Sequence, residues 1–505
     1  MKHWTFAGST ALVTLALTAP SWADVTPEEV WQNWQDLSAA YGQTITTESV
    51  ERDGDTLVVT GLQMAYAKDD VSATGTIVEL RLRDTGDGAV EITMSDTIPF
   101  DMTVPAEEEG GTPTEIGLLI TQPGMVVIAA GDVAETSYDF TAPSVTVALD
   151  SIEGVDAEKV EMDAEFVLTN MAGKYLLGGT ADARGINSSF QADSVAINVS
   201  GSNPEDQSSG VFAVTMADLS GTTNGTFLDM AAMEDMAAAL KAGFATEGTF
   251  AYGATTYSFD VTEATGPTKM TGTADGGNLT FALDATRMAY GGSAKAASMT
   301  ISGPEIPFPE LAFGYSEAAF NFEMPVGPTP EPANFALLTK LVDVTVSDDL
   351  WGMIDPAASL PRDPATIVID TTGTAKLTAS IMDPAAMETL GDTPPGELYS
   401  LDVNEIRASI AGAELTGAGA FTFDNTDLVT FGGMPAPTGK LDLKLVGGNT
   451  LMDRLVAMGL LPEDQVMGFR MMLSMFANAG PGEDELNSTL EFKDKGFFAN
   501  GQRLQ

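Results

Sequence analysis

The sequence predicts a mainly β protein of the α+β class, in which extended, curved antiparallel sheets of long meanders pack with several amphipathic helices. Apolar and polar residues alternate with a period of two from residue 44 to about residue 326, as in strands that bury one face. The chain contains 51 glycines, which supply turns between these runs. A few segments instead show the three-to-four-residue spacing of helices. Regularly spaced strands of this kind favour a large antiparallel sheet over parallel units.

The strands are marked by short alternating runs with turn residues between them. Residues 84–88 read Asp-Thr-Gly-Asp-Gly between two such runs, which is a strong hairpin signal. Comparable runs occupy residues 57–64, 77–82, 90–94, 145–149, 166–168, 195–199, 212–214, 279–283, 320–322, 367–369, 376–381, 398–410 and 421–423.

Four segments are predicted as helices by their apolar spacing. Residues 24–43 begin with Thr26 as a good N-cap, Pro27 at the first helical position and two acids that suit the positive helix end. Residues 227–244, 335–354 and 451–460 also carry helical stripes, although β-branched residues weaken the second of these. We expect the helix at residues 24–43 to pack on its own sheet.

A further helix is predicted at residues 463–478, and it is apolar on nearly every side. Such a helix is either buried on several sides, which its composition favours, or meets an apolar ligand or a partner. The second alternative makes this helix a candidate binding surface, formed by Val466, Met467, Phe469, Met471, Met472, Met475 and Phe476.

The chain is expected to divide into a leader and two regions. Residues 1–23 combine a basic start, an apolar run of about 15 residues and a small-residue exit, the order of a secretory signal peptide. That run is short of the roughly 20 residues needed to span a bilayer. Prolines around residues 325–332 then suggest a boundary between a β-rich region at 24–325 and a helix/β region at 326–505. We therefore expect an exported protein of the Gram-negative periplasm without a transmembrane helix.

Cleavage of the leader would remove His3, the only histidine, and the chain contains no cysteine. A Ser–His–Asp triad, a Cys–His pair and a zinc site with nitrogen or sulfur ligands are then excluded. The formal net charge of −49 makes binding to nucleic acid or to anionic lipid headgroups by charge unfavourable. We expect neither an enzyme nor a cofactor, and no catalytic, cofactor or metal residue can be nominated.

Carboxylates could still support two kinds of site. A glycosidase needs only two facing acids, but with 72 acids the composition cannot select a pair. Asp84 with Asp87, and the acids at 483–485, are local clusters that do not match a calcium loop, so turn chemistry and solvation explain them better. Residues 434–441 echo a phosphate-binding loop but lack its leading glycine and its Ser/Thr, which favours a hairpin turn.

Three stretches together resemble a known family. Residues 350–356 read Leu-Trp-Gly-Met-Ile-Asp-Pro, and residues 360–366 read Leu-Pro-Arg-Asp-Pro-Ala-Thr. Gly61 to Met64 and the closing Asn500 and Gly501 complete the pattern. With the leader and the length, the chain resembles the uncharacterised bacterial envelope family known as domain of unknown function 2125, and more distantly large β-rich envelope proteins of the lipid-handling type. The family brings no catalytic residues. Arg362, next to Asp363, is expected to form a structural ion pair.

The sequence thus favours a non-catalytic exported envelope protein that binds a lipid, another apolar ligand or an envelope partner through a long β-sheet groove. One alternative is a structural or interaction module without a small ligand. A carboxylate-based glycoside hydrolase is a further alternative. An outer-membrane barrel suits the predicted helices poorly. The oligomeric state is left open.

Overall fold

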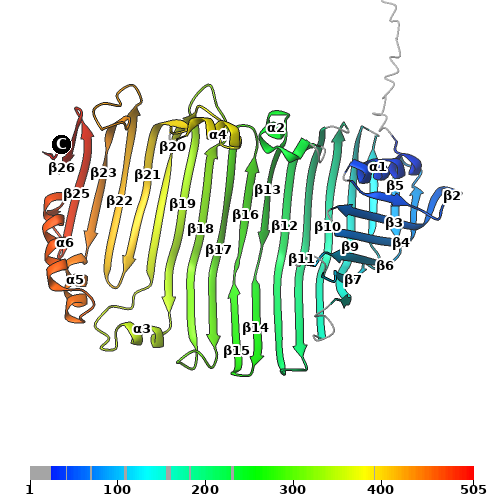
Figure 1. The fold of residues 1–505 in the computed structure, drawn as a ribbon, viewed down its shortest axis with the longest axis horizontal. Coiled ribbons are helices and arrows are strands. Elements are labelled where there is room, and N and C mark those ends of the chain that lie inside the picture. The colour runs from blue at the N-terminus through cyan, green and yellow to red at the C-terminus, as the bar shows by residue number, and fades with distance from the viewer. Residues whose placement is uncertain are drawn as a thin grey trace, which may run out of the picture.

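The computed structural model describes residues 24–40, 42–68, 71–106, 111–132, 134–154, 161–180, 183–228, 232–391 and 393–505. The predicted leader at residues 1–23 lies outside this part of the chain. The described residues form one 27-stranded antiparallel sheet with short helices around it (Figure 1). Both regions suggested by the sequence belong to this sheet, because β18 pairs with β19 across the proline cluster.

The helices are α1 (Pro27–Ala40), α2 (Met236–Lys241), α3 (Asp348–Ile354), α4 (Pro384–Leu390), α5 (Gly448–Ala457) and α6 (Glu463–Phe476), with a 3₁₀ turn, η2 (Ala232–Glu234). The strands before α2 are β1 (Thr44–Thr46), β2 (Ser49–Asp53), β3 (Thr56–Lys68), β4 (Val71–Asp84), β5 (Ala89–Met94), β6 (Thr97–Val104), β7 (Thr114–Thr121), β8 (Val126–Gly131), β9 (Glu135–Glu153), β10 (Glu161–Gly179), β11 (Ala183–Asn203) and β12 (Ser208–Leu228). The strands after α2 are β13 (Ala245–Tyr252), β14 (Thr255–Glu263), β15 (Gly266–Ala274), β16 (Gly276–Leu283), β17 (Arg287–Ser302), β18 (Leu311–Pro325), β19 (Ala333–Val346), β20 (Ala365–Leu377), β21 (Gly396–Ile410), β22 (Ala413–Asp424), β23 (Ala436–Val446), β24 (Asn478–Ala479), β25 (Glu485–Lys493), β26 (Gly496–Ala499) and β27 (Gln502–Arg503).

Several predicted elements are confirmed. Helix α1 begins at Pro27, with Thr26 and Glu29 forming reciprocal capping hydrogen bonds. The predicted hairpin at residues 84–88 joins β4 to β5. Helices α5 and α6 occupy the segments predicted near residues 451–460 and 463–478.

Two helix predictions need correction. Residues 335–346 belong to strand β19, which pairs with β18 and β20 on its two sides, so only α3 remains of the helix predicted at 335–354. Val342, Val344 and Val346 are β-branched and favour the pleated strand. Of the helix predicted at 227–244, residues 227 and 228 end β12, and the described helix is limited to η2 and α2.

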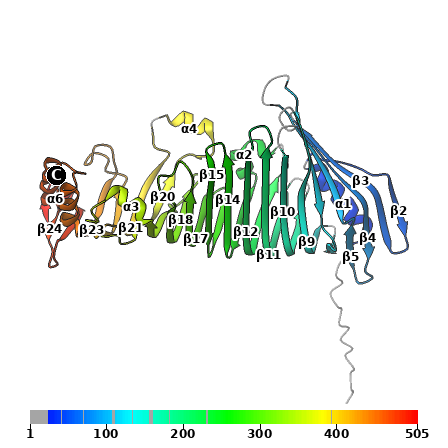
Figure 2. The same cartoon turned by 90° about the horizontal axis from the view of Figure 1, so that it is seen from below.

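The sheet is a single layer along most of its length, and Figure 2 shows no second layer stacked against its middle strands. Helices lie around its perimeter (Figure 1): α1 at one end, α5 and α6 at the other, α2 and α4 along one long edge, and α3 along the opposite edge. Sheets of this kind usually cover one apolar face with helices or with another sheet. Here the described helices leave the centre of both faces open.

A line of bulges keeps the apolar side chains on one face. Asn170, Asp218, Ala296 and Asp343 adopt positive φ values of 49°, 52°, 47° and 53° within β10, β12, β17 and β19. Each such residue shifts the in–out alternation of its strand by one position. Side chains three residues apart therefore share a face, as Leu168 and Met171, and Met216 and Leu219, do in one apolar cluster.

The best-packed part of the molecule lies at its N-terminal end, where the sheet wraps around α1. Val30 of α1 is fully buried there, together with Val59, Leu80 and Ile92 of the surrounding strands. Trp31 is 7% exposed in the same cluster. This end has an ordinary hydrophobic core, in contrast to the single-layered middle of the sheet.

Candidate functional site

The middle of the sheet presents an open apolar face. The strand register places Phe190, Phe250, Leu279, Phe320, Ile369 and Ile406 in one row that crosses β11, β12, β13 and β16 to β21. A neighbouring row on the same face contains Phe281, Tyr290, Phe322 and Leu337. At about 4.8 Å per strand, the first row is roughly 40 Å long.

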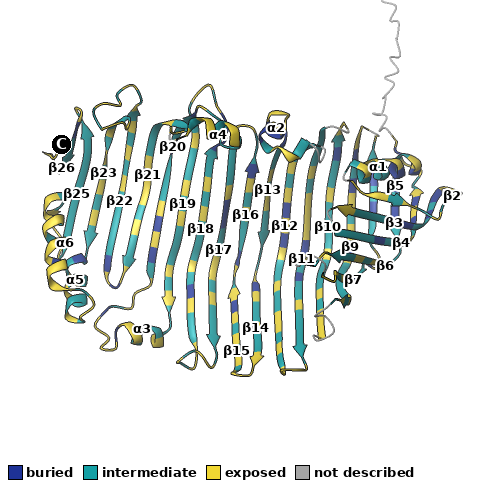
Figure 3. Cartoon of the chain, in the orientation of Figure 1, coloured by how far each residue is buried: buried dark blue, intermediate teal, exposed yellow. Residues whose placement is uncertain are grey.

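These side chains are partly accessible to solvent. The exposed fraction is 37% for Phe281, 49% for Tyr290, 39% for Phe322 and 45% for Leu337. In Figure 3 the central strands are mainly intermediate or exposed. A contiguous apolar surface larger than a few hundred Å² is rare on a soluble monomer and marks a binding site for a ligand, a partner or a membrane.

The opposite face of the same strands is polar. Thr222, Thr249 and Thr280 pair across three strands there, and Asn321 lies in the same region of the sheet. The hydroxyls of Thr222 and Thr249 are hydrogen-bonded at 2.8 Å. The sheet is therefore amphipathic, with one face suited to water and the other suited to hydrocarbon.

Aromatic rings lie flat across the apolar face because glycines face them in the neighbouring strands. Phe190 pairs with Gly221 of β12, and a Cβ added to Gly221 would lie 2.9 Å from Cζ of the Phe190 ring and closer still to Cε1. Phe281 covers Gly248 in the same manner, and Phe335 covers Gly373. Rings that lie over glycines produce a smooth apolar surface instead of separate projecting side chains.

The pairing of Phe190 with Gly221 can be tested by substitution. Gly221→Ala is expected to lower the free energy of unfolding by about 1–3 kcal/mol, because the added methyl group forces the ring away from the sheet. The same substitution in a Phe190→Leu background should cost clearly less. Urea denaturation of the two single variants and the double variant measures this coupling, and fully additive losses would show that the ring and the glycine act independently.

One long edge of the apolar face is overhung by α2. Ala239, Leu240 and Phe244 form a buried cluster with Phe227 and Leu283, which lie on the apolar side of β12 and β16. Asp235 caps α2 by accepting a hydrogen bond from the Ala238 N–H. The same cluster includes Met382, just before α4, so the two short helices form a rim along this edge.

Helix α6, the candidate surface from the sequence, lies at the C-terminal end of the sheet. Val466 is buried and Phe476 is half-buried. The remaining members are exposed: Met467 at 61%, Phe469 at 57%, Met471 at 67%, Met472 at 46% and Met475 at 59%. The alternative that this helix is buried on several sides is therefore wrong, because the single-layered sheet covers only one side of it.

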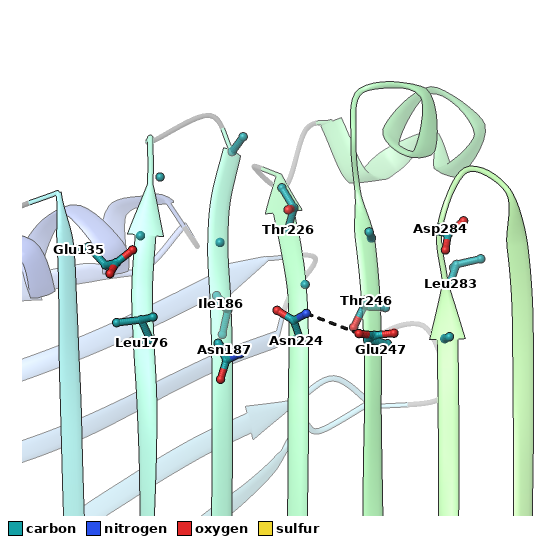
Figure 4. A pocket seen from close by; sticks show the side chains of 17 residues that line it. Glu135, Leu176, Ile186, Asn187, Asn224, Thr226, Thr246, Glu247, Leu283 and Asp284 are labelled. Atoms are coloured by element: carbon teal, nitrogen blue, oxygen red, sulfur yellow. Dashed lines mark hydrogen bonds between the residues drawn. The ribbon is translucent and has the colours of Figure 1, made fainter.

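The polar face contains a depression of about 770 Å³ near the edge at which α2 lies (Figure 4). Its acidic residues include Glu247 and Asp284, which lie 3.6 Å and 3.7 Å from Arg287 nitrogens. Burial alone would raise the pKa of Asp284, but hydrogen bonds from Thr286 and Arg287 outweigh it and lower that pKa. A glycosidase needs a general acid with a raised pKa, and Asp284 does not fit that role.

The remaining acidic clusters have structural partners. Asp484 accepts hydrogen bonds from the N–H groups of Asn449 and Thr450 at the start of α5, and Glu485 pairs with Lys444 at 3.2 Å. Asp84 accepts a hydrogen bond from Gly86 within its turn. In the described ranges, no group of three or more His, Cys, Asp or Glu residues could hold a metal ion. Lys440 of the phosphate-loop-like stretch lies in β23 and bonds to Asp442.

The stretch that contains Leu-Pro-Arg-Asp-Pro closes the loop between α3 and β20. Asp355 is fully buried and its Oδ2 accepts a hydrogen bond from the Leu360 N–H at 2.6 Å. Arg362 forms an ion pair with Asp348, which confirms a structural pair, although with a different acid from its neighbour Asp363. The characteristic residues of this stretch therefore fix a loop at the edge of the sheet.

Asp355 should make the stability of the protein depend on pH in the acidic range. Backbone hydrogen bonds from Leu360 and Ser359 hold the pKa of Asp355 below its ordinary value of 3.8. A carboxyl group whose pKa is lower in the folded state than in the unfolded state stabilises the fold at any pH above its unfolded-state pKa. This stabilisation is lost as the pH falls through its folded-state pKa. We expect Asp355→Asn to flatten the fall in Tm between about pH 5 and about pH 2, compared with the wild type and with Asp349→Asn. Identical pH profiles would contradict this role.

Comparison with known proteins gives a family for the chain. In the residues that the structure describes, no helix is both long and apolar enough to cross a membrane. Searches of curated proteins and of solved structures found no significant match. Residues 238–501 match the model of a family described as an uncharacterised protein conserved in bacteria, DUF2125. The matched part extends from α2 to the last strands, including most of the open apolar face and α6, and the chain belongs to this family.

Proposed function

We propose that this chain is a non-catalytic exported envelope protein that binds the hydrocarbon chains of lipids along the apolar face of its sheet. The observation that carries the proposal is the pair of aromatic and aliphatic rows on β11 to β21, which the described helices border but do not cover. Burial of a hydrocarbon chain against such a surface gains about 0.8 kcal/mol per CH₂ group.

The dimensions of the face suit a lipid chain. The hydrocarbon core of a bilayer is about 30 Å thick and contains two layers of chains, so one chain extends roughly 15 Å. The row of roughly 40 Å is longer than that. The face could hold a chain along its length, while the polar face and the strand ends remain in water.

The charge of the molecule supports a hydrocarbon-directed mode of binding. The formal net charge is −49, so attraction to anionic headgroups contributes little. Lys340 follows Thr339 of the first row and lies on the polar face, where it pairs with Glu317 at 2.7 Å. Recognition would therefore depend on shape and apolar area, and headgroups would remain outside the sheet.

Mass spectrometry of an organic extract tests the proposal. The full chain is purified from the bacterial envelope without detergent, and the extract is compared with that of an unrelated exported protein prepared in parallel. We expect a lipid in the extract at a fixed ratio to protein. The absence of lipid, together with no binding of added fatty acid, would overturn the proposal. Sequencing of the N-terminus of the same sample tests whether the leader is cleaved before Asp24.

The exposed surface of α6 favours a second candidate function, an interaction module that binds an envelope partner. Met467, Met471 and Met475 follow one another at a spacing of four residues and form one stripe on the helix. We expect the double variant Met467→Ser, Met471→Ser to lose a specific cross-linked product in envelope fractions, whereas Gln465→Ser on the same helix retains it. An unchanged pattern of cross-links in the double variant would remove this candidate.

A further inference from the structure

A small apolar cavity lies beneath α1, at the N-terminal end of the apolar face. Its volume is about 280 Å³. Side chains of α1, β1, β3, β8, β9 and β10 line it, together with one residue of the turn before β8.

The cavity lies on the same face of the sheet as the apolar rows, and its lining is apolar like theirs. Phe140 lines the cavity and pairs across the sheet with Gly173, which in turn pairs with Phe190 at the start of the long apolar row. Tyr175 lines the cavity as well, and its ring centroid lies 5.3 Å from that of Tyr138. The apolar face therefore continues at β9 and β10 into a recess that is covered on one side by α1 and is still partly open to solvent.

Beyond the cavity the molecule is filled. Trp31, Leu62 and Val127 belong both to the cavity wall and to the buried cluster around α1. A ligand that extends along the face from the centre of the sheet would reach its end here. The cavity thus lies where the apolar face meets the buried cluster around α1.

The wall of the cavity suits hydrocarbon and not a charged group. None of its lining residues is acidic or basic, so a buried carboxylate or phosphate would find no opposite charge. Burial raises the pKa of Tyr138 to about 12, which keeps its hydroxyl neutral. An engineered apolar cavity of about 150 Å³ stays dry and binds benzene, so a space nearly twice that size can accept part of an alkyl chain.

We propose that this cavity receives the methyl end of a hydrocarbon chain bound on the apolar face, and so fixes the direction and the position of the chain. The inference rests on the proposed function, which supplies the chain. It adds a polarity: the methyl end lies under α1, and the headgroup lies toward the middle of the sheet.

Tryptophan fluorescence can test the direction of the chain. The sequence has five tryptophans, of which Trp31 and Trp34 line the cavity. In the full chain with Trp4→Phe, Trp22→Phe and Trp351→Phe, only these two report. Two fatty acids serve as probes, one brominated near the methyl end and one brominated beside the carboxylate. We expect the first probe to quench the fluorescence at least twofold more strongly than the second at equal occupancy.

Ser38→Phe provides the matched variant, because Ser38 lines the cavity on α1 and a phenyl ring there would fill it. Ala39→Phe is the control, since Ala39 is exposed on the same helix. We expect the filled variant to lose the difference between the probes and the control to retain it. Circular dichroism checks that each variant is folded, and Ser38→Leu replaces Ser38→Phe if the larger side chain is not tolerated.

A separate binding measurement distinguishes the two proposals. Equilibrium dialysis with radiolabelled fatty acid gives the occupancy without use of the tryptophans. Binding without quenching, or equal quenching by the two probes, would overturn the cavity assignment and leave lipid binding intact. The absence of binding would overturn both.

Discussion

The double variant Phe281→Ser, Phe322→Ser is expected to weaken the binding of a long-chain fatty acid by about tenfold. Both rings lie in one row on either side of Tyr290 and are 37% and 39% exposed. A fully exposed phenylalanine gains about 1.5–3 kcal/mol on burial, so the exposed part of each ring contributes about 0.5–1 kcal/mol. Two rings then contribute about 1.4 kcal/mol, which is a factor of ten in Kd. Equilibrium dialysis measures the change.

The same two strands offer a matched control. Thr280 and Asn321 are the chain neighbours of Phe281 and Phe322 and lie on the polar face. The double variant Thr280→Ser, Asn321→Ser should bind fatty acid as the wild type does. An equal loss of affinity in both double variants would mean that the substitutions act through the stability of the sheet. If the variant Phe281→Ser, Phe322→Ser bound fatty acid with unchanged affinity, the ligand would have to bind elsewhere.

The second large effect is on stability, and it separates the packed end from the open middle of the sheet. Leu80→Ala is expected to lower the free energy of unfolding by about 2–5 kcal/mol, because this leucine is fully buried around α1. Leu337→Ala, on the apolar face, should cost less than about half as much, because Leu337 is 45% exposed. Urea denaturation of the full chain, followed by circular dichroism, compares the two variants.

Equal losses of unfolding free energy in the two variants would contradict the description of the apolar face as open. If Leu337→Ala destabilised the protein as strongly as Leu80→Ala, the middle of the sheet would be as well packed as the core around α1. The comparison is matched in residue type and in the atoms removed, so the difference reports the burial at each site.

The strand pattern was predictable because each strand carries its own alternation. The hairpin at residues 84–88, helix α1 and helices α5 and α6 follow from local signals that the structure confirms. The helix prediction for residues 335–346 was wrong because Leu337, Leu338 and Leu341 also fit a helical spacing. This segment forms a strand because it pairs with β18 and β20, and the sequence of one segment does not show which strands it will pair with.

The open apolar face was only partly predictable. A long sheet with an apolar groove followed from the alternation, but the rows themselves depend on the register of strands far apart in the sequence. Gly221 is one signal that could have been used: it stands in an alternating strand at a position where an apolar side chain is expected, and Phe190 occupies the space above it. The sequence analysis instead nominated α6 as a binding surface, because its apolar residues lie close together within one short segment.

Photocrosslinking with a fatty acid that carries a diazirine on its chain tests the central claim most directly. Peptide mapping of the cross-linked full chain should place the adducts on apolar-face residues of the central strands, such as Phe281, Tyr290 and Phe322, and an excess of unlabelled fatty acid should remove them. Adducts that fall equally on Thr280 and Asn321, or that resist competition, would contradict a lipid-binding apolar face.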